Sequence, residues 1–120
     1  ITGTAPKFHR CPYGDYDNNA IRTIRSIGME PIQWNVDSLD WKELTAPEIT
    51  QRVMKNVIPG SIILFHNAAI HTPEALPGII EALQKDGYTL CTVSELVYQG
   101  EYTIDNNGMQ CPKGTEKDSK

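Results

Sequence analysis

Apolar and polar residues alternate in blocks along the chain, and these blocks predict strands and helices in turn. Mostly apolar runs predict four strands, at residues 7–9, 30–36, 60–66 and 88–93. The run at 60–66 contains an unbroken apolar stretch, which is typical of a strand that is buried on both faces of a parallel sheet. The pattern therefore favours parallel strands over a half-exposed antiparallel sheet.

A helix is predicted after each strand from apolar spacing and capping residues. The predicted first residues or N-caps are Asp17, Thr45, Thr72 and Thr92. Side chains of these types accept hydrogen bonds from the first turn of a helix. The helix at Thr72 would begin with Pro73, and its predicted buried face is Leu76, Ile79, Ile80 and Leu83.

Alternating strands and helices require crossover connections and a parallel sheet, either an open doubly wound layer or part of a barrel. In both architectures, ligands bind where the strands end. The predicted strand ends are followed by residues 10–14, 37–41 and 65–67, and we expect these three segments to meet at one edge. After Gly100 the sequence becomes polar, so residues 100–120 are predicted to be a solvated tail without regular structure.

The three segments contain groups suited to acid-base chemistry on a polar ligand: His66, Asp40, Arg10, Tyr13 and Trp41. A nearby carboxylate favours the protonated form of a histidine, which can then act as a general acid, and Asp40 is the candidate carboxylate. Trp41 and Tyr13 offer flat walls for a sugar ring or an acyl methyl group. The alternative is that His66 is an ordinary loop residue and that residues 37–41 only cap the next loop.

Composition and charge narrow the classes of function. A hydrophobic content of 39% and a charged content of 22% are ordinary for one globular domain. The net charge of −4, without a run of basic residues, predicts no nucleic-acid partner. No apolar stretch approaches the roughly 20 residues that span a bilayer, and residues 1–4 lack the features of a signal peptide. Three cysteines without CxxC spacing predict free thiols.

The sequences RCPYG (residues 10–14), DSLDW (37–41) and LFH (64–66) occur in this order. They resemble the third, fourth and fifth motifs of the polysaccharide deacetylases, the NodB-homology carbohydrate esterases of family four. The resemblance extends over residues 7–99, and residues 67–96 resemble the closing helix and strand of the peptidoglycan-deacetylase branch. It implies an α/β fold, the C-terminal half of a distorted, incomplete (β/α) barrel with parallel strands, and a deacetylase portion at residues 1–99.

The resemblance also implies roles for individual residues. Arg10 would orient and charge-stabilise a catalytic aspartate of the family's first motif, and the Tyr13 backbone N–H would help to hold the oxyanion while its ring lines the groove. Asp40 would adjust the protonation of His66, which would protonate the leaving amine. Trp41 and Leu64 would form the pocket for the acetyl methyl group. Cys11 differs from the proline that is common at its position.

Family members use a divalent metal, commonly zinc, to deacetylate N-acetylglucosamine units or acetylated xylan. The first two family motifs, which supply the base and the metal ligands, do not occur in these 120 residues, and none of the three histidines belongs to an HxxxH pair. The resemblance therefore implies metal ligands outside this chain. We expect the N-terminal half of the domain to be a second chain, separated by cleavage in an exposed loop.

The implied substrate is peptidoglycan, and the implied location is the bacterial cell surface or the extracellular space. Two alternatives from other classes remain. A non-catalytic glycan-binding module would keep Tyr13 and Trp41 without needing Arg10, Asp40 and His66 together. A flavodoxin-like regulatory domain would explain the alternating strands and helices, but it would not explain residues 37–41 and 64–66.

Overall fold

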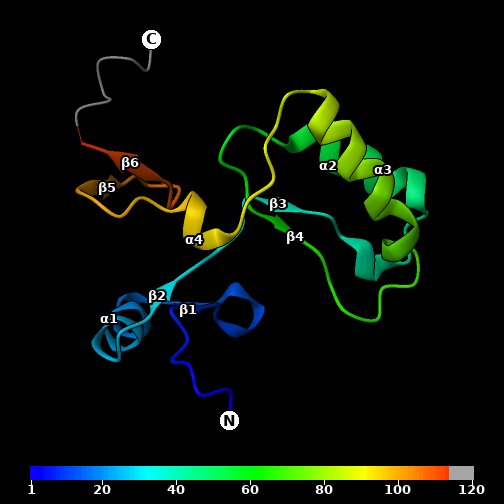
Figure 1. The fold of residues 1–120 in the computed structure, drawn as a ribbon. Helices are drawn as coiled ribbons and strands as arrows, with labels where there is room; N and C mark the ends of the chain where they lie inside the picture. Colours follow the sequence, from blue (N-terminus) through cyan, green and yellow to red (C-terminus); the bar gives the residue numbers. More distant parts are fainter. Residues whose placement is uncertain (114–120) are drawn as a thin grey trace.

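The computed structural model describes residues 1–113, which form an open mixed α/β arrangement (Figure 1). The helices are α1 (Asn18–Ser26), α2 (Ala46–Asn56), α3 (Thr72–Lys85) and α4 (Val93–Leu96). The strands are β1 (Phe8–His9), β2 (Glu30–Pro31), β3 (Val36–Asp37), β4 (Ile63–Leu64), β5 (Tyr102–Ile104) and β6 (Gln110–Pro112). Two short 3-10 turns, Pro12–Gly14 and Asp40–Lys42, follow β1 and β3.

The first four strands pair in parallel, as predicted, but in two separate pairs. β1 pairs with β2, and β3 pairs with β4 with Asp37 opposite Leu64. The single strand predicted at 30–36 is thus divided between two sheets. Its backbone bonds first to the β1 side, from the Ile32 N–H to the His9 carbonyl, and then to the β4 side, from the Asn35 N–H to the Ile62 carbonyl. The described residues form no continuous parallel sheet.

The strand predicted at residues 88–93 is not present, and this prediction was wrong. A strand needs a neighbouring backbone to receive its hydrogen bonds. The Tyr88 N–H instead bonds back to the Leu83 carbonyl at the end of α3, residues 89–92 are exposed, and Thr92 caps α4. The apolar residues of this segment therefore gave a false indication of a strand.

The predicted unstructured tail instead contains an antiparallel hairpin of β5 and β6. The connecting turn is held by the Asp105 carboxylate, which accepts the N–H groups of Asn107 and Met109, while Gly108 adopts a positive φ of 82°. Asn and Gly are the residues that such turns favour, a pattern that the polar composition concealed. The rest of the predicted tail, residues 114–120, lies outside the described residues.

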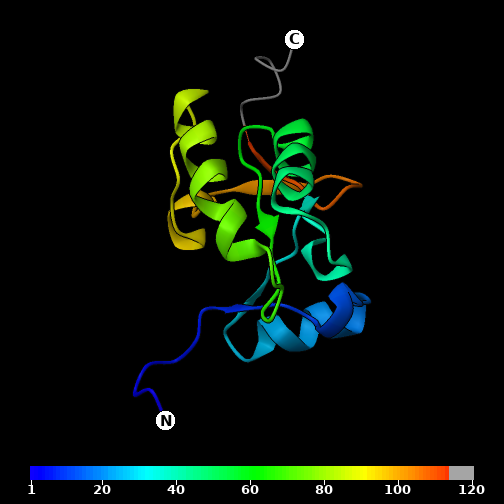
Figure 2. The same ribbon diagram turned by 90° about the vertical axis from the view of Figure 1, so that its right-hand side faces the viewer.

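The largest core lies between α2 and α3, which run side by side in both views (Figure 1, Figure 2). Its buried members are Ala46, Ile49, Val53, Ala75, Ile79 and Leu83. Of the predicted face of α3, Ile80 is 41% exposed, so its assignment to the core was wrong. Residues 75, 79 and 83 repeat every four positions and share one face, from which Ile80 is rotated away. Ile63 of β4 and Phe65 also pack on this core and fix the segment that leads to His66.

The radius of gyration is 16.2 Å, larger than the roughly 13.5 Å of a compact domain of this length. The first strand pair and α1 lie at the far end of the molecule from α2 and α3 (Figure 1, Figure 2). No helix in residues 1–113 has both the length and the apolar character needed to cross a membrane. The molecule therefore has two regions, and the candidate residues are divided between them.

Candidate functional site

Asp40 is the most deeply buried charged group of the site, with 1% of its surface exposed. It begins the 3-10 turn after β3, and Leu39 immediately before it adopts a left-handed conformation with φ 53°. Val36 of β3 is also 1% exposed, so the strand fixes the start of this turn firmly in the interior. This local path directs the Asp40 carboxylate toward the end of β4.

His66 meets this carboxylate through both its backbone and its ring. Its N–H donates to Asp40 Oδ2 over 2.9 Å, and its Nδ1 lies 2.7 Å from Asp40 Oδ1. The His66 side chain is 34% exposed, whereas the Asp40 side chain is fully buried. One edge of the His66 imidazole therefore faces solvent, and the other edge contacts the buried Asp40 carboxylate.

The surroundings of Asp40 favour its ionised form. Burial by itself raises the pKa of this carboxyl, but the hydrogen bonds from the His66 N–H, the Thr72 hydroxyl, the His66 ring and Ser38 outweigh burial and lower the pKa below its ordinary value. An ionised carboxylate can only accept hydrogen bonds, so the proton between the two side chains lies on Nδ1 of His66. Nε2 is then the atom of the ring that remains for chemistry at the surface.

Thr72 and Ser38 complete the buried network, although neither was predicted from the sequence to belong to the site. The Thr72 hydroxyl donates to Asp40 Oδ2 over 2.6 Å, and Ser38 Oγ accepts the Asp40 N–H over 3.4 Å. Thr72 was predicted as the N-cap of α3. The N-cap is instead His71, which makes no side-chain capping bond, and Thr72 is the first residue of the helix. Ser38 lies in the DSLDW motif, which was its only sequence indication.

Trp41 lies beside His66, and Leu64 lies in β4 two residues before it. The Trp41 ring is 56% exposed and stands edge-on to the His66 ring, with centroids 6.5 Å apart. Lys42 Nζ lies 5.3 Å from the centre of the Trp41 ring. Leu64 is half-buried in β4, and its carbonyl accepts the Ser38 N–H. The indole of Trp41 thus lies next to the partly exposed His66 ring.

Arg10 and Tyr13 lie in the other region of the molecule. The Arg10 guanidinium stacks over Trp34, 5.6 Å from the ring centre, and the Tyr13 side chain is fully exposed. In residues 1–113, no hydrogen bond, ion pair or ring contact joins either residue to Asp40 or His66. The structure therefore brings together the ends of β3 and β4, and it does not bring the end of β1 into contact with them.

The turn that carries Tyr13 has a constrained backbone. Tyr13 adopts a left-handed conformation with φ 58°, which is uncommon for a residue with a side chain. Gly14 follows with φ 69°, and a Cβ atom there would lie 2.5 Å from Cη2 of Trp34. The Gln33 side-chain amide also donates to the Gly14 carbonyl over 3.0 Å. Glycine is therefore required at this position by both φ and space.

The described residues do not fit a divalent metal. They contain no group of three or more His, Cys, Asp or Glu side chains arranged to hold an ion, and a tight zinc site needs three or four converging ligands. His66 uses Nδ1 for Asp40, and His71 Nδ1 lies 3.5 Å from Glu74 on the surface. Cys11, Cys91 and Cys111 form no disulfide in residues 1–113.

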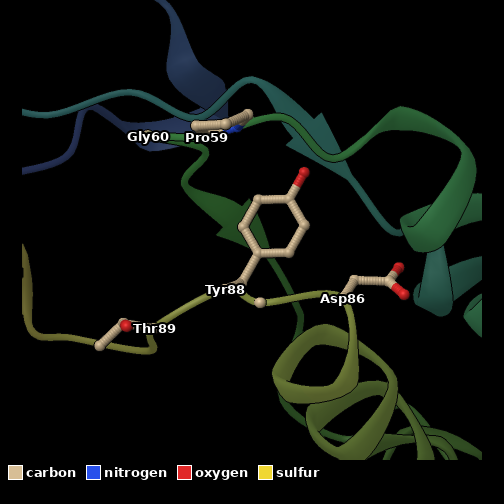
Figure 3. A pocket seen from close by; sticks show the side chains of 6 residues that line it. Pro59, Gly60, Asp86, Tyr88 and Thr89 are labelled. Atoms are coloured by element: carbon tan, nitrogen blue, oxygen red, sulfur yellow. The ribbon is translucent and has the colours of Figure 1, made fainter.

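A cavity of about 500 Å³ lies elsewhere, between the loop before β4 and the end of α3. The Tyr88 ring projects from the chain after α3 toward the segment of Pro59 and Gly60 (Figure 3). Asp86 is the only residue of its lining with a charged side chain. None of the candidate residues lines this cavity, so it is separate from the Asp40 and His66 pair.

Comparison with curated proteins identifies relatives of one kind, although no family model matches the chain. A peptidoglycan-N-acetylglucosamine deacetylase of Bacillus cereus is 41% identical over 86 residues, covering 71% of this chain and 30% of the relative. The peptidoglycan-N-acetylglucosamine deacetylase PgdA of Listeria monocytogenes is 34% identical over 95 residues, which cover 79% of this chain and 20% of the relative. The peptidoglycan-N-acetylmuramic acid deacetylase PdaC of Bacillus subtilis is 36% identical over 96 residues, covering 80% and 20%.

Solved structures give the same result. The Bc1960 peptidoglycan N-acetylglucosamine deacetylase superposes with a TM-score of 0.75 at 35% identity, covering 78% of this chain and 46% of that one. A CE4 family pseudoenzyme from Bacillus anthracis superposes with a TM-score of 0.72 at 32% identity, covering 75% and 32%. The chain thus spans less than half of each of these proteins. These matches confirm the resemblance drawn from the three motifs, and the chain belongs to the CE4 family of polysaccharide deacetylases.

Proposed function

We propose that the protein containing this chain removes acetyl groups from N-acetylglucosamine residues of a cell-wall polysaccharide, with peptidoglycan as the main substrate. The observation that carries this proposal is the buried Asp40 carboxylate, whose Oδ1 lies 2.7 Å from Nδ1 of His66, while the His66 side chain is 34% exposed. The relatives named above are peptidoglycan deacetylases, which supports the substrate class.

His66 is the general acid in this proposal. In the hydrolysis of an acetamide, the oxygen of water bonds to the acetyl carbon, the C–N bond breaks, and the leaving nitrogen takes a proton. A histidine whose Nδ1 is held by an ionised carboxylate can donate that proton from Nε2. The products are acetate and a free amine on the sugar. The Asp40 carboxylate keeps its own charge throughout and balances the charge of the protonated ring.

The substrate would be held by residues on either side of His66. Trp41 and Leu64 form the apolar surface for the acetyl methyl group. The Tyr13 N–H is an oxyanion donor in this proposal, supported by its lack of a hydrogen-bond acceptor within residues 1–113 and by its left-handed backbone. Arg10 would pair with the base. Both require the end of β1 to approach His66 in the complete site.

The remaining parts of the reaction are proposed to come from outside this chain. The N-terminal half of the domain would supply the catalytic base and the ligands of a divalent metal, for which zinc is the proposed ion. Such an ion polarises the acetyl carbonyl and activates water when bound. Residues 1–113 do not themselves fit such an ion. The proposed location is the bacterial cell surface or the extracellular space.

An inactive family member is the second candidate. The chain superposes on a CE4 pseudoenzyme with a TM-score of 0.72 and on a deacetylase with 0.75, so the fold does not separate the two functions. An inactive member could still bind glycan through the exposed Trp41 and Tyr13 rings. Acetate release distinguishes the two, because binding alone releases none.

The test uses the purified protein that contains this chain, examined by native and denaturing mass spectrometry, by metal analysis, and by acetate release from N-acetylglucosamine oligomers and from peptidoglycan. We expect metal-dependent acetate release that falls on the order of 10²–10⁴-fold in His66→Ala, the range for loss of a general acid. His71→Gln is the control, since this exposed histidine makes no bond to Asp40. A folded, metal-loaded wild-type protein that releases no acetate would contradict the proposal and favour the inactive member.

A further inference from the structure

We propose that Thr72 is a positioning residue for the Asp40 and His66 pair, a role that rests on the proposed function of that site. Thr72 is 6% exposed, and the side-chain hydrogen bond that it makes in residues 1–113 goes to Asp40 and not to His66. Its hydroxyl donates to Oδ2 of Asp40, the oxygen that does not face the His66 ring. It would therefore influence catalysis through Asp40 alone.

The two carboxylate oxygens of Asp40 have different hydrogen-bond partners. Oδ2 accepts both the His66 N–H, over 2.9 Å, and the Thr72 hydroxyl, over 2.6 Å. Oδ1 is left for Nδ1 of His66, over 2.7 Å. With two donors fixing Oδ2, rotation of the carboxylate about its Cβ–Cγ bond is opposed, and Oδ1 remains aligned with the ring. Thr72 thus helps to select which nitrogen of His66 stays available.

The position of the Thr72 hydroxyl is itself fixed by the core. Thr72 is the first residue of α3, and the same helix buries Ala75, Ile79 and Leu83 against α2. The hydroxyl is not used to cap the helix, because the N-cap position belongs to His71. A threonine that an N-terminal pattern would assign to capping therefore directs its side-chain donor to a buried carboxylate.

Removing this hydroxyl should weaken the ionised form of Asp40 and its alignment. The Thr72 hydrogen bond is among those that lower the pKa of Asp40, and burial opposes them. Without it, Asp40 takes up a proton at a higher pH, and a protonated Asp40 can donate to Nδ1 and leave the imidazole with the wrong tautomer. The loss should appear in kcat rather than in KM, since Thr72 does not contact substrate.

The test compares Thr72→Val, which keeps the shape without the hydroxyl, with Thr72→Ser, which keeps the hydroxyl. The matched control is Thr50→Val, because the Thr50 hydroxyl donates only to the Ala46 carbonyl in α2. In the protein containing this chain, we expect Thr72→Val to lower kcat on the order of 10- to 100-fold, as for loss of a hydrogen bond to a charged group. KM should stay near the wild-type value, the acid limb of the pH profile should move to higher pH, and Thr72→Ser should restore most of the activity.

A second readout does not depend on activity. Nitrogen NMR of the His66 ring should show a protonated Nδ1 in the wild type and a changed Nδ1 environment in Thr72→Val but not in Thr50→Val. Circular dichroism is measured first, and Thr72→Ala replaces Thr72→Val if the valine variant does not fold. An inactive wild type with these ring signals would reject the proposed function and retain the role of Thr72. The role of Thr72 would be rejected if the folded Thr72→Val variant kept the wild-type ring signals and the wild-type kcat. It would also be rejected if Thr72→Ser did not restore the activity that Thr72→Val had lost.

Discussion

Nδ1 of His66 lies 2.7 Å from Oδ1 of Asp40, although 26 positions separate the two residues in the chain. The parallel pairing of β3 with β4 produces this contact, because Asp37 lies opposite Leu64 and the segments that follow the two strands continue in the same direction. Each then places a polar side chain within three residues of the strand end. The contact therefore depends on one short strand pair and on the helix core that supports it.

Replacing Asp40 by Asn should abolish most acetate release while preserving the fold. The amide of Asn can donate to Nδ1 and so favour the tautomer with its proton on Nε2, and it cannot balance a protonated ring. We expect kcat to fall on the order of 10²–10⁴-fold, measured by acetate release alongside circular dichroism. Asp37→Asn is the control, since the Asp37 carboxylate accepts the nearby Leu39 N–H and makes no hydrogen bond to Asp40 or His66 in residues 1–113. Equal activity of the two variants would exclude Asp40 from the reaction.

The ionised Asp40 should also make stability depend on pH in the acid range. Its pKa in the folded protein lies below the ordinary value of 3.8, so the unfolded chain binds the proton more readily. The stabilisation is therefore fully present above that ordinary value and is lost as the pH falls through the lower, folded-state pKa. Urea unfolding at a series of pH values should show the free energy of unfolding of the wild type declining there, with a shallower decline in Asp40→Asn. Parallel curves for the two proteins would contradict this.

Gly14→Ala should destabilise the turn that carries Tyr13. The added Cβ would lie 2.5 Å from Cη2 of Trp34, and the residue would keep a φ of 69°. We expect a loss of about 1–3 kcal/mol in the free energy of unfolding, from strain at this position. Gly78→Ala in α3 is the matched control, because a Cβ there meets nothing within 4 Å. That control should stabilise the protein by about 0.5–1 kcal/mol, so a result of the same sign at both positions would be inconsistent with the structure.

The packing of α3 predicts different effects at two adjacent isoleucines. Ile79 is 2% exposed in the core, whereas Ile80 is 41% exposed. Ile79→Ala should lower the free energy of unfolding by about 2–5 kcal/mol through loss of buried contacts, and Ile80→Ala should change it by about 0.5 kcal/mol or less. Denaturant unfolding of the two variants measures both values. Comparable losses would mean that the apolar face of α3 includes Ile80, as the sequence alone had led us to expect.

The family and several local features could be predicted from the sequence, because they depend on residues close together in the chain. The three motifs led to the family that the relatives confirm. Thr45 and Thr92 are N-caps, as predicted, and each forms a capping box, which needs only a threonine and a glutamate three residues later. Parallel pairing also followed from the apolar run at 60–66.

Only the tertiary structure decided which distant groups meet. It paired Asp40 with His66, directed the Thr72 hydroxyl to that carboxylate, and left Arg10 stacked on Trp34. Residues 88–93, which were predicted to be a strand, pair with no other strand in the described structure, and the Tyr88 N–H bonds instead to the Leu83 carbonyl at the end of α3. Local sequence determines caps, turns and periodicity, whereas strand pairing and buried hydrogen bonds depend on partners far along the chain, and these become defined only when the helices and strands pack together.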